Sequence, residues 1–386
     1  MISRLACALC LLASAVACAE DAVSLQRVPQ GGMKPSLAVD DTGAVHLVYF
    51  KGEPRGGDAF YAASRDGGAT WSDAVRVNSQ AGSVLGVSSI RGPRLALGRG
   101  GRVHVVWNGS SVARPKAPLN PAMPADSPFN GTPLLYARLD AVARTFEPQR
   151  NLMARTCALD GGADVAADAE GRVFAVWHAM LPGAKSEADR AVWIARSADD
   201  GRTFSEETNV LPTATGACGC CALAARAGEG GALAILYRGA TESVHRGMHL
   251  LISRDRGATF ASTSLADWNL AACPMSHAAL LPRGADFLAA SERAGTVWLT
   301  GLAATALAAD ERTEGQKYPA LAMNARGDLL LAWTEGMGWN KGGALAWKIF
   351  PAGKLESGAA MHRGTVPAHG SAAAFTRPDG TFVLMY

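Results

Sequence analysis

The chain lacks an excess of charge of either sign, and beyond its first residues it lacks any long apolar run. Its 37 lysines and arginines nearly balance its 34 aspartates and glutamates, which leaves a formal net charge of +3 over 386 residues. This balance argues against the basic footprint of a nucleic-acid-binding protein, so no nucleic-acid partner is expected. After residue 19, no stretch holds the roughly 18 consecutive apolar residues that a membrane-spanning helix needs, and no transmembrane segment is expected.

Residues 1–19 have the composition of a secretory signal peptide. Arg4 supplies the positive charge, and the run from Leu5 to Ala17 is apolar but too short to cross a membrane. Ala17-Cys18-Ala19 fits the small-x-small cleavage rule, so residues 20–386 are predicted to form the mature protein as a single domain. The alternative is a lipoprotein site, with the mature chain anchored through a lipid on Cys18. In both cases the protein is predicted to be exported, to a periplasm or to the cell exterior.

One eight-residue pattern occurs three times and predicts a tight turn between two strands. Residues 64–71, 197–204 and 253–260 each read S-x-D-x-G-x-T followed by Trp or Phe. An aspartate side chain can accept hydrogen bonds from backbone N–H groups further along the chain, which folds a turn. Glycine supplies the positive φ that such a turn often needs, and Ser and Thr hydroxyls close further bonds. The pattern, which we call the repeated turn, therefore predicts a structural unit rather than a reactive one.

Pairs of short strands also recur, at intervals of roughly 40–70 residues, which is typical of propeller blades. Each pair consists of a strand, a tight turn and a second strand, and the pairs begin near Lys34, Pro93, Ala163, Ala222, His277, Pro319 and Ser371. The predicted fold class is all-β: a β-propeller of four-stranded antiparallel blades, seven by the count of repeats, with six as the alternative. The last repeat stops after two strands, and residues 23–28 are predicted to complete it and close the ring.

Propeller geometry predicts which face carries a site. The segments that lead into the innermost strands, which we call the lead-in segments, share one face with the loops between second and third strands. The repeated turns lie on the other face. Side chains on the lead-in face that could bind an acidic substrate are Lys34, Arg91, Arg94, Trp339 and Lys341. Trp339 lies in a glycine-rich loop, where it either forms a platform for a sugar ring or packs on its own hairpin.

The repeated turns, in an exported propeller pattern, resemble the Asp-box or BNR-repeat proteins of the sialidase superfamily. The resemblance covers most of residues 35–350 and implies a glycan-directed protein, with sialidase-like glycoside hydrolysis as the activity of an enzyme of this type. Sialidases are six-bladed and hold the substrate carboxylate with three arginines, and here Lys34 stands where the first arginine is expected. The resemblance also implies a tyrosine nucleophile with a glutamate partner and an aspartate acid, for which the candidates are Tyr318, Glu292 or Glu335, and Asp58.

Five cysteines follow residue 19, all in the lead-in segments of three successive repeats: Cys157, Cys218, Cys220, Cys221 and Cys273. An oxidising compartment favours disulfides from Cys157 or Cys273 to the cluster at residues 218–221, although an odd count leaves one thiol over. The alternative is a soft-metal site for copper or zinc, in which His178 and His277 from the same repeats join the thiolates. Strand alternation would then place Cys218 and Cys220 on one side and Cys221 on the other.

Three functions follow from these patterns. The leading prediction is an exported, sialidase-like propeller that binds or hydrolyses a glycan at the mouth of its channel. The second is a non-enzymatic periplasmic protein whose Cys, His and Met side chains bind copper or zinc. The third is a propeller that serves only as a platform for a protein partner.

Overall fold

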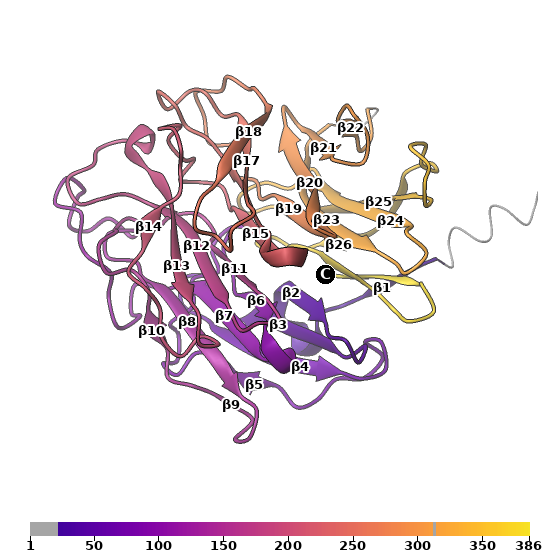
Figure 1. The fold of residues 1–386 in the computed structure, drawn as a ribbon, viewed down its shortest axis with the longest axis horizontal. Helices are drawn as coiled ribbons and strands as arrows, with labels where there is room; N and C mark the ends of the chain where they lie inside the picture. The colour runs from indigo at the N-terminus through magenta and orange to yellow at the C-terminus, as the bar shows by residue number, and fades with distance from the viewer. Residues whose placement is uncertain (1–21, 312–313) are drawn as a thin grey trace, which may run out of the picture.

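The computed structural model describes residues 22–311 and 314–386. The predictions of a signal peptide and of a lipid on Cys18 therefore lie outside the described residues. Seven β-sheets are arranged around a central axis, each forming one blade (Figure 1). The predicted seven-bladed, all-β propeller is confirmed, and the six-bladed alternative is wrong. The described residues contain no helix that is long and apolar enough to cross a membrane.

The first three blades are built in chain order from the inside outward. The first contains β2 (Met33–Val39), β3 (Val45–Lys51), β4 (Asp58–Ser64) and β5 (Val75–Arg76). The second contains β6 (Arg94–Leu97), β7 (Val103–Asn108), β8 (Leu134–Asp140) and β10 (Arg150–Asn151), with β9 (Thr145–Phe146) also paired to β8. The third contains β11 (Asp164–Ala167), β12 (Val173–Ala179), β13 (Ala191–Ser197) and β14 (Thr208–Asn209).

The next three blades follow the same order. The fourth contains β15 (Ala224–Ala227), β16 (Leu233–Arg238), β17 (Met248–Ser253) and β18 (Ala261–Ala266). The fifth contains β19 (Ala279–Arg283), β20 (Asp286–Arg293), β21 (Thr296–Thr300) and β22 (Leu307–Ala308). The sixth contains β23 (Gln316–Met323), β24 (Leu329–Glu335), β25 (Gly343–Phe350) and β26 (Met361–Val366). Short 3-10 turns lie between elements: η1 (Pro29–Gly31), η2 (Arg99–Gly101), η3 (Glu187–Asp189) and η4 (Glu229–Gly231).

The seventh blade joins the two ends of the chain. It contains β27 (Ala373–Thr376), β28 (Phe382–Met385) and, as its outer strand, β1 (Val23–Gln26). β1 pairs with β28 in parallel, with Val23 opposite Phe382. Figure 1 shows β1 beside the C-terminal end of the chain. The predicted closure of the ring by residues 23–28 is therefore confirmed for Val23–Gln26.

The core lies between neighbouring blades, because each sheet is covered by a blade on both faces. The strands are rich in Val, Leu, Ile and Ala, as expected for sheets that are buried on both sides. Trp107, Trp177 and Trp333 occupy the same place near the ends of the second strands of three blades, and each is fully buried. Large aromatic side chains of this kind contribute much of the apolar area that holds adjacent blades together.

The repeated turn has the hydrogen bonds that its residues predict, and they are the same in all three copies. In the second copy the Ser197 hydroxyl donates to Asp199 Oδ1 at 2.7 Å and accepts from the backbone N–H of Gly201 at 2.9 Å. Asp199 in turn accepts from the backbone N–H and the hydroxyl of Thr203, at 2.9 and 2.6 Å. Matching bonds join Ser64, Asp66 and Thr70, and also Ser253, Asp255 and Thr259. The same set of hydrogen bonds among its own residues therefore forms the turn in each of the three blades.

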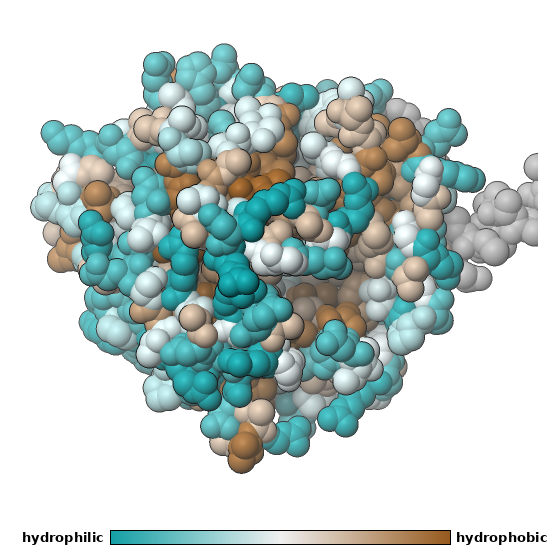
Figure 2. Space-filling view, viewed as in Figure 1, coloured by the Kyte–Doolittle hydropathy of each residue, from teal (hydrophilic) through white to brown (hydrophobic). Residues whose placement is uncertain are grey.

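The repeated turns lie on the same face as the turns after the inner strands, as predicted. The N–H of Asp200 donates to the carbonyl of Gly171 at 2.9 Å, and the N–H of Arg256 donates to the carbonyl of Gly231 in η4 at 3.2 Å. Figure 2 shows the face that carries η4: hydrophilic side chains cover most of it, and apolar side chains appear in the hollow near its centre. The lead-in segments reach the opposite face, where the candidate site lies.

Loss of the serine in one repeated turn should destabilise the fold measurably. Ser197→Ala leaves the buried N–H of Gly201 without its acceptor, so we expect the free energy of unfolding to fall by about 1–3 kcal/mol. Chemical denaturation, compared with the control Ser262→Ala at an exposed position of β18, measures the difference. Equal stability of the two variants would contradict the structural role of this turn.

Candidate functional site

The lead-in segments share an unusual backbone conformation. Six non-glycine residues with φ between 48° and 62° lie in them, one in each of six blades: Lys34, Ser88, Ala158, Met275, Tyr318 and His369. A non-glycine residue in this left-handed region costs about 1–3 kcal/mol and persists only where its surroundings impose it. Such strain tends to gather at functional sites, which directs attention to this face of the ring.

Three predicted substrate-binding cations converge where the first two blades meet. Gly92 lies against the side chain of Lys34 so closely that a Cβ there would be 2.9 Å from Lys34 Cδ. Burial, together with the charges of Arg94 and Arg91, holds the pKa of Lys34 well below its usual value. Lys34 Nζ donates to the carbonyl of Ser88, and no carboxylate of the described residues pairs with it.

Arg91 is fixed by the lead-in segment of the third blade. Its guanidinium forms an ion pair with Asp160 and donates to the Asp160 carbonyl at 2.6 Å. The side chain of Arg91 is almost completely buried, and it also lies 4.9 Å from the centre of the Phe129 ring. Burial raises the pKa of Asp160, although Arg91 and Arg190 oppose this shift.

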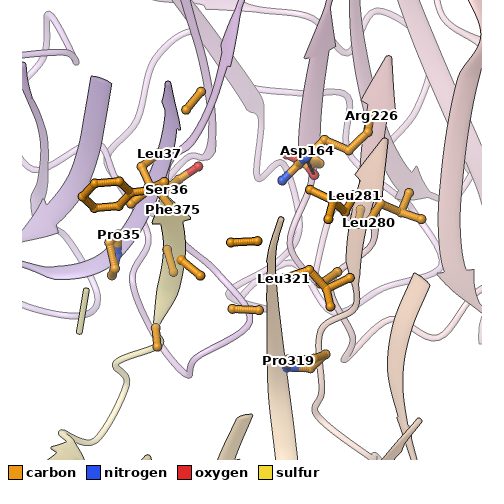
Figure 3. Close-up of a pocket in the computed structure, with 18 of the residues that line it drawn as sticks. Pro35, Ser36, Leu37, Asp164, Arg226, Leu280, Leu281, Pro319, Leu321 and Phe375 are labelled. Atoms are coloured by element: carbon orange, nitrogen blue, oxygen red, sulfur yellow. Dashed lines mark hydrogen bonds and ion pairs between the residues drawn. The ribbon is translucent and has the colours of Figure 1, made fainter. Parts of the chain in front are cut away.

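A cavity of about 240 Å³ runs along the inner strands in the channel. Figure 3 shows side chains of several inner strands around it, including Ser36, Leu280, Leu321 and the pair formed by Asp164 and Arg226. Arg226 Nη1 lies 2.8 Å from Asp164 Oδ2, and Arg94 lines the same cavity. Most of the side chains that line the channel are therefore apolar, and the charged side chains Arg94, Asp164 and Arg226 interrupt them.

Tyr318 and Glu292, predicted as a catalytic pair, both lie buried on the lead-in face and are both engaged. The Tyr318 hydroxyl donates to the carbonyl of Met275 at 2.9 Å, and burial raises its pKa to about 12. Glu292 Oε2 lies 3.2 Å from Arg238 Nη2, and Glu292 Oε1 accepts from the N–H of Gly295 at 3.0 Å. Burial raises the pKa of Glu292, although Arg238 opposes this shift.

The other two predicted catalytic carboxylates have structural partners. Glu335 accepts from Trp333 Nε1 on its own strand at 2.8 Å and pairs with His362 of β26 at 3.3 Å, so it connects β24 to β26 within the sixth blade. Asp58 accepts from Asn78 Nδ2 at 2.6 Å and from the N–H of Gly82 at 2.8 Å, which fixes the loop after the first blade.

Trp339 and Lys341 lie in a tight loop between β24 and β25. The N–H of Gly338 donates to the carbonyl of Lys341 at 3.1 Å, which places Trp339 at the tip of the loop with 42% of its surface exposed. Lys341 is exposed as well. The sugar-platform and hairpin-packing interpretations of Trp339 both stay predictions.

Three of the five cysteines come together, and they do so through a turn rather than a strand. Cys218 Sγ lies 3.4 Å from both Cys220 Sγ and Cys221 Sγ, and all three sulfurs lie within 4.8 Å of one another. The N–H of Cys221 donates to the carbonyl of Cys218 at 3.4 Å, which turns the chain back on itself. The expected alternation, with Cys221 on the opposite side, is therefore wrong, because the segment is not extended.

No two cysteine sulfurs of the described residues lie at disulfide distance, so the structure does not show the predicted disulfides to this cluster. Cys157 is buried beside Met180, and Cys273 is exposed. Neither Cys157 nor Cys273 belongs to the group of three sulfurs.

The two predicted histidine ligands also lie outside the group. His178 Nε2 donates to the carbonyl of Cys221 at 2.8 Å, and burial lowers its pKa to about 3. His277 packs against Tyr318 with ring centres 5.2 Å apart. Burial and the charge of Arg94 lower the pKa of His277 to about 3. Both rings are therefore neutral near pH 7, held by packing and backbone contacts.

Several charged groups around the cluster were not singled out from the sequence. Glu187 Oε1 accepts from the N–H of Gly219 at 2.6 Å, and its other oxygen pairs with Arg246 at 2.6 Å. Arg190 donates to the carbonyl of Ala158 at 2.6 Å. Ser186 and Asp189 form a capping box at η3, so the S-x-x-D pattern was the signal that could have placed Glu187 and Arg190 on an ordered turn.

Comparison with known proteins supports the fold. No protein-family model and no curated protein sequence matches the chain. An alpha-L-arabinanase from Penicillium chrysogenum is similar over 84% of this chain and 94% of its own, with 13% identity and a TM-score of 0.52. An alpha-L-arabinofuranosidase from Fusarium graminearum gives the same coverage, with 12% identity and a TM-score of 0.53.

A Hadza microbial sialidase is similar over 90% of this chain, with 14% identity and a TM-score of 0.49, and the chain spans 61% of its length. At such low identities the similarities show the fold alone. The chain has the propeller fold that its repeated turns predicted, and the arabinanase and the arabinofuranosidase share a similar fold.

Neutralisation of Glu292 should change how stability depends on pH. Because burial raises the pKa of Glu292 above 4.5, the folded protein binds this proton more tightly than the unfolded chain does. The resulting stabilisation is fully present below the unfolded pKa and is lost as the pH rises through the folded pKa. We therefore expect Glu292→Gln to lose less stability than the wild type between about pH 4 and 8.

Melting temperatures measured across this range test the prediction, with the exposed Glu53→Gln as the control. Parallel curves for the wild type and Glu292→Gln would show that Glu292 titrates alike in the folded and unfolded states.

Proposed function

We propose that the protein is an exported, sialidase-like propeller that binds acidic glycans at the mouth of its channel. The observation that carries this proposal is the convergence of Lys34, Arg91 and Arg94. Asp160 balances Arg91, and Asp164 lies near Arg94 but also pairs with Arg226. Lys34 has no carboxylate partner among the described residues, so the group keeps an excess of positive charge. A carboxylate or sulfate on a sugar would supply the missing negative charge.

The dimensions of the channel limit what can enter it. The cavity of about 240 Å³ lies below the roughly 300–1,000 Å³ of a typical small-molecule site. A single acidic sugar unit is therefore the largest part of a glycan that we place inside it, with the remaining units across the mouth. Trp339 lies on the same face, and an exposed tryptophan ring is suited to stacking against a sugar.

Sugar binding by a propeller of similar fold supports a glycan as the ligand. The arabinanase from Penicillium chrysogenum was solved in complex with arabinobiose. Export is supported by the composition of residues 1–19, which would bring the protein to a compartment where polysaccharides occur.

The proposal is confined to binding because the candidate catalytic groups are engaged elsewhere. Sialidase-like hydrolysis would need Tyr318 as the nucleophile and Glu292 as its base. The Tyr318 hydroxyl instead donates to a backbone carbonyl, and Glu292 is bound to Arg238. Glu335 and Asp58 hold strands and loops in place.

Removal of the Lys34 charge should weaken the binding of an acidic oligosaccharide. A charge-assisted hydrogen bond of this kind corresponds to a loss of roughly 10- to 100-fold in affinity, so we expect this loss for Lys34→Met. A bound carboxylate would also raise the pKa of Lys34 toward its usual value, so binding takes up a proton. Affinity should therefore fall as the pH rises through the pKa of Lys34 in the free protein. Isothermal titration calorimetry measures both effects.

The exposed Lys51→Met, from the same blade, is the matched control and should bind as the wild type does. A wild-type protein that binds neutral and acidic oligosaccharides equally would overturn the proposal. Turnover of a fluorogenic sialoside that is abolished in Tyr318→Phe would show that the protein is a hydrolase and not only a binding protein.

A further inference from the structure

The three sulfurs at residues 218–221 form the one group of metal-ligating side chains found in the described part of the chain. A metal–sulfur bond of about 2.3 Å, with three sulfurs in a plane around the ion, places the sulfurs about 4.0 Å apart. The observed separations are 3.4 Å for two pairs, with all three sulfurs within 4.8 Å of one another. Small side-chain rotations would therefore bring all three sulfurs to bonding distance of a common centre.

The backbone around the cluster is fixed, which favours a preformed site. The N–H of Cys218 donates to the carbonyl of Arg238 at 2.9 Å, and the N–H of Gly219 is held by Glu187. Cys218 and Cys221 are buried, and Cys220 is half-buried, so Cys220 is the sulfur nearest to solvent. An ion can thus reach the group from the side of Cys220 while the other two sulfurs remain shielded.

Positive side chains surround the cluster and suit an anionic complex. Three thiolates with a monovalent ion carry a net charge of −2, and with a divalent ion −1. The guanidinium of Arg190 lies so close to Gly219 that a Cβ there would be 3.3 Å from Arg190 Nε and Nη2. Arg190 Nε is buried and has no hydrogen-bond partner among the described residues, so it can donate to a metal-bound sulfur. Arg246 is connected to the cluster through Glu187, with which it forms an ion pair at 2.6 Å.

We propose that Cys218, Cys220 and Cys221 form a binding site for a thiophilic d10 metal ion, with Cu(I) preferred over Zn(II). Soft thiolates select such ions. Structural Zn(II) sites almost always have four ligands, whereas no imidazole or carboxylate of the described residues joins these three sulfurs. Three-coordinate sulfur ligation suits Cu(I). The inference does not rest on glycan binding, because the sulfurs and the cations at Lys34 are separate groups.

Titration of the reduced full-length chain with each ion under anaerobic conditions tests the proposal. Bathocuproine disulfonate competes for Cu(I), and pyridylazoresorcinol competes for Zn(II). We expect about one equivalent of Cu(I) to be retained, with ultraviolet thiolate-to-metal charge-transfer absorption. Removal of a residue that only supports a metal ligand typically lowers metal affinity by roughly 10- to 100-fold. Cys220→Ser removes a ligand itself, so its metal affinity should fall by at least this factor.

Cys157→Ser and Cys273→Ser remove cysteines outside the cluster and should bind metal as the wild type does. Cys220→Ser is preferred to changes at the two buried cysteines because it disturbs packing least, and circular dichroism checks that it folds. The Cys220→Ser variant should still bind acidic glycans, and the Lys34→Met variant should still bind metal. The metal-site proposal and the glycan-binding proposal can therefore fail independently. If the protein retains Zn(II) but not Cu(I), the three cysteines form a zinc site, and the proposed preference for Cu(I) is wrong.

Two results would overturn the site. One is equal metal affinity in the wild type and a folded Cys220→Ser variant. The other is a disulfide between Cys218 and Cys221, found by peptide mapping of the protein as purified, because it would remove two of the three ligands.

Discussion

The parallel pairing of β1 with β28 is the contact on which the arrangement of this protein depends. It joins the first described strand to the last, and so converts a row of blades into a closed ring. Closure brings the lead-in segments of all seven blades to one central mouth, although they are spread over more than 300 residues of sequence. The strained backbone of these segments is tolerated because blades on both sides hold them in place.

Closure of the ring also brings charged side chains from different blades close together. Lys34 from the first blade, Arg91 and Arg94 from the second, and Asp160 from the third meet although they are far apart in the chain. Burial lowers the pKa of Lys34, and the nearby charges of Arg94 and Arg91 lower it further. A fold that keeps such an imbalance buried near a channel favours an anionic ligand, which would relieve it. The thiol cluster lies on the same face, in the segment that leads into the fourth blade, with Arg190 beside it.

The fold could be predicted from the sequence because its signals are local. Ser197, Asp199 and Thr203 bond to one another within seven residues, so a short motif carries the whole turn. The convergence of Lys34 with Arg91 and Arg94 could also be predicted, because it depends only on the order of the blades. The partners of Glu335, Asp58 and Cys221 could not, because they depend on loop conformations that no periodic pattern encodes. Cys221 shows this most clearly: strand alternation failed where the chain makes a tight turn.

The central claim is that the acidic group of a glycan is held by the cations at the channel mouth. A crystal structure of the protein soaked with an acidic disaccharide tests this claim most directly. The account predicts the sugar carboxylate within hydrogen-bonding distance of Lys34 Nζ or the Arg94 guanidinium. A disaccharide bound elsewhere on the ring, or one whose carboxylate points away from these side chains into solvent, would contradict it.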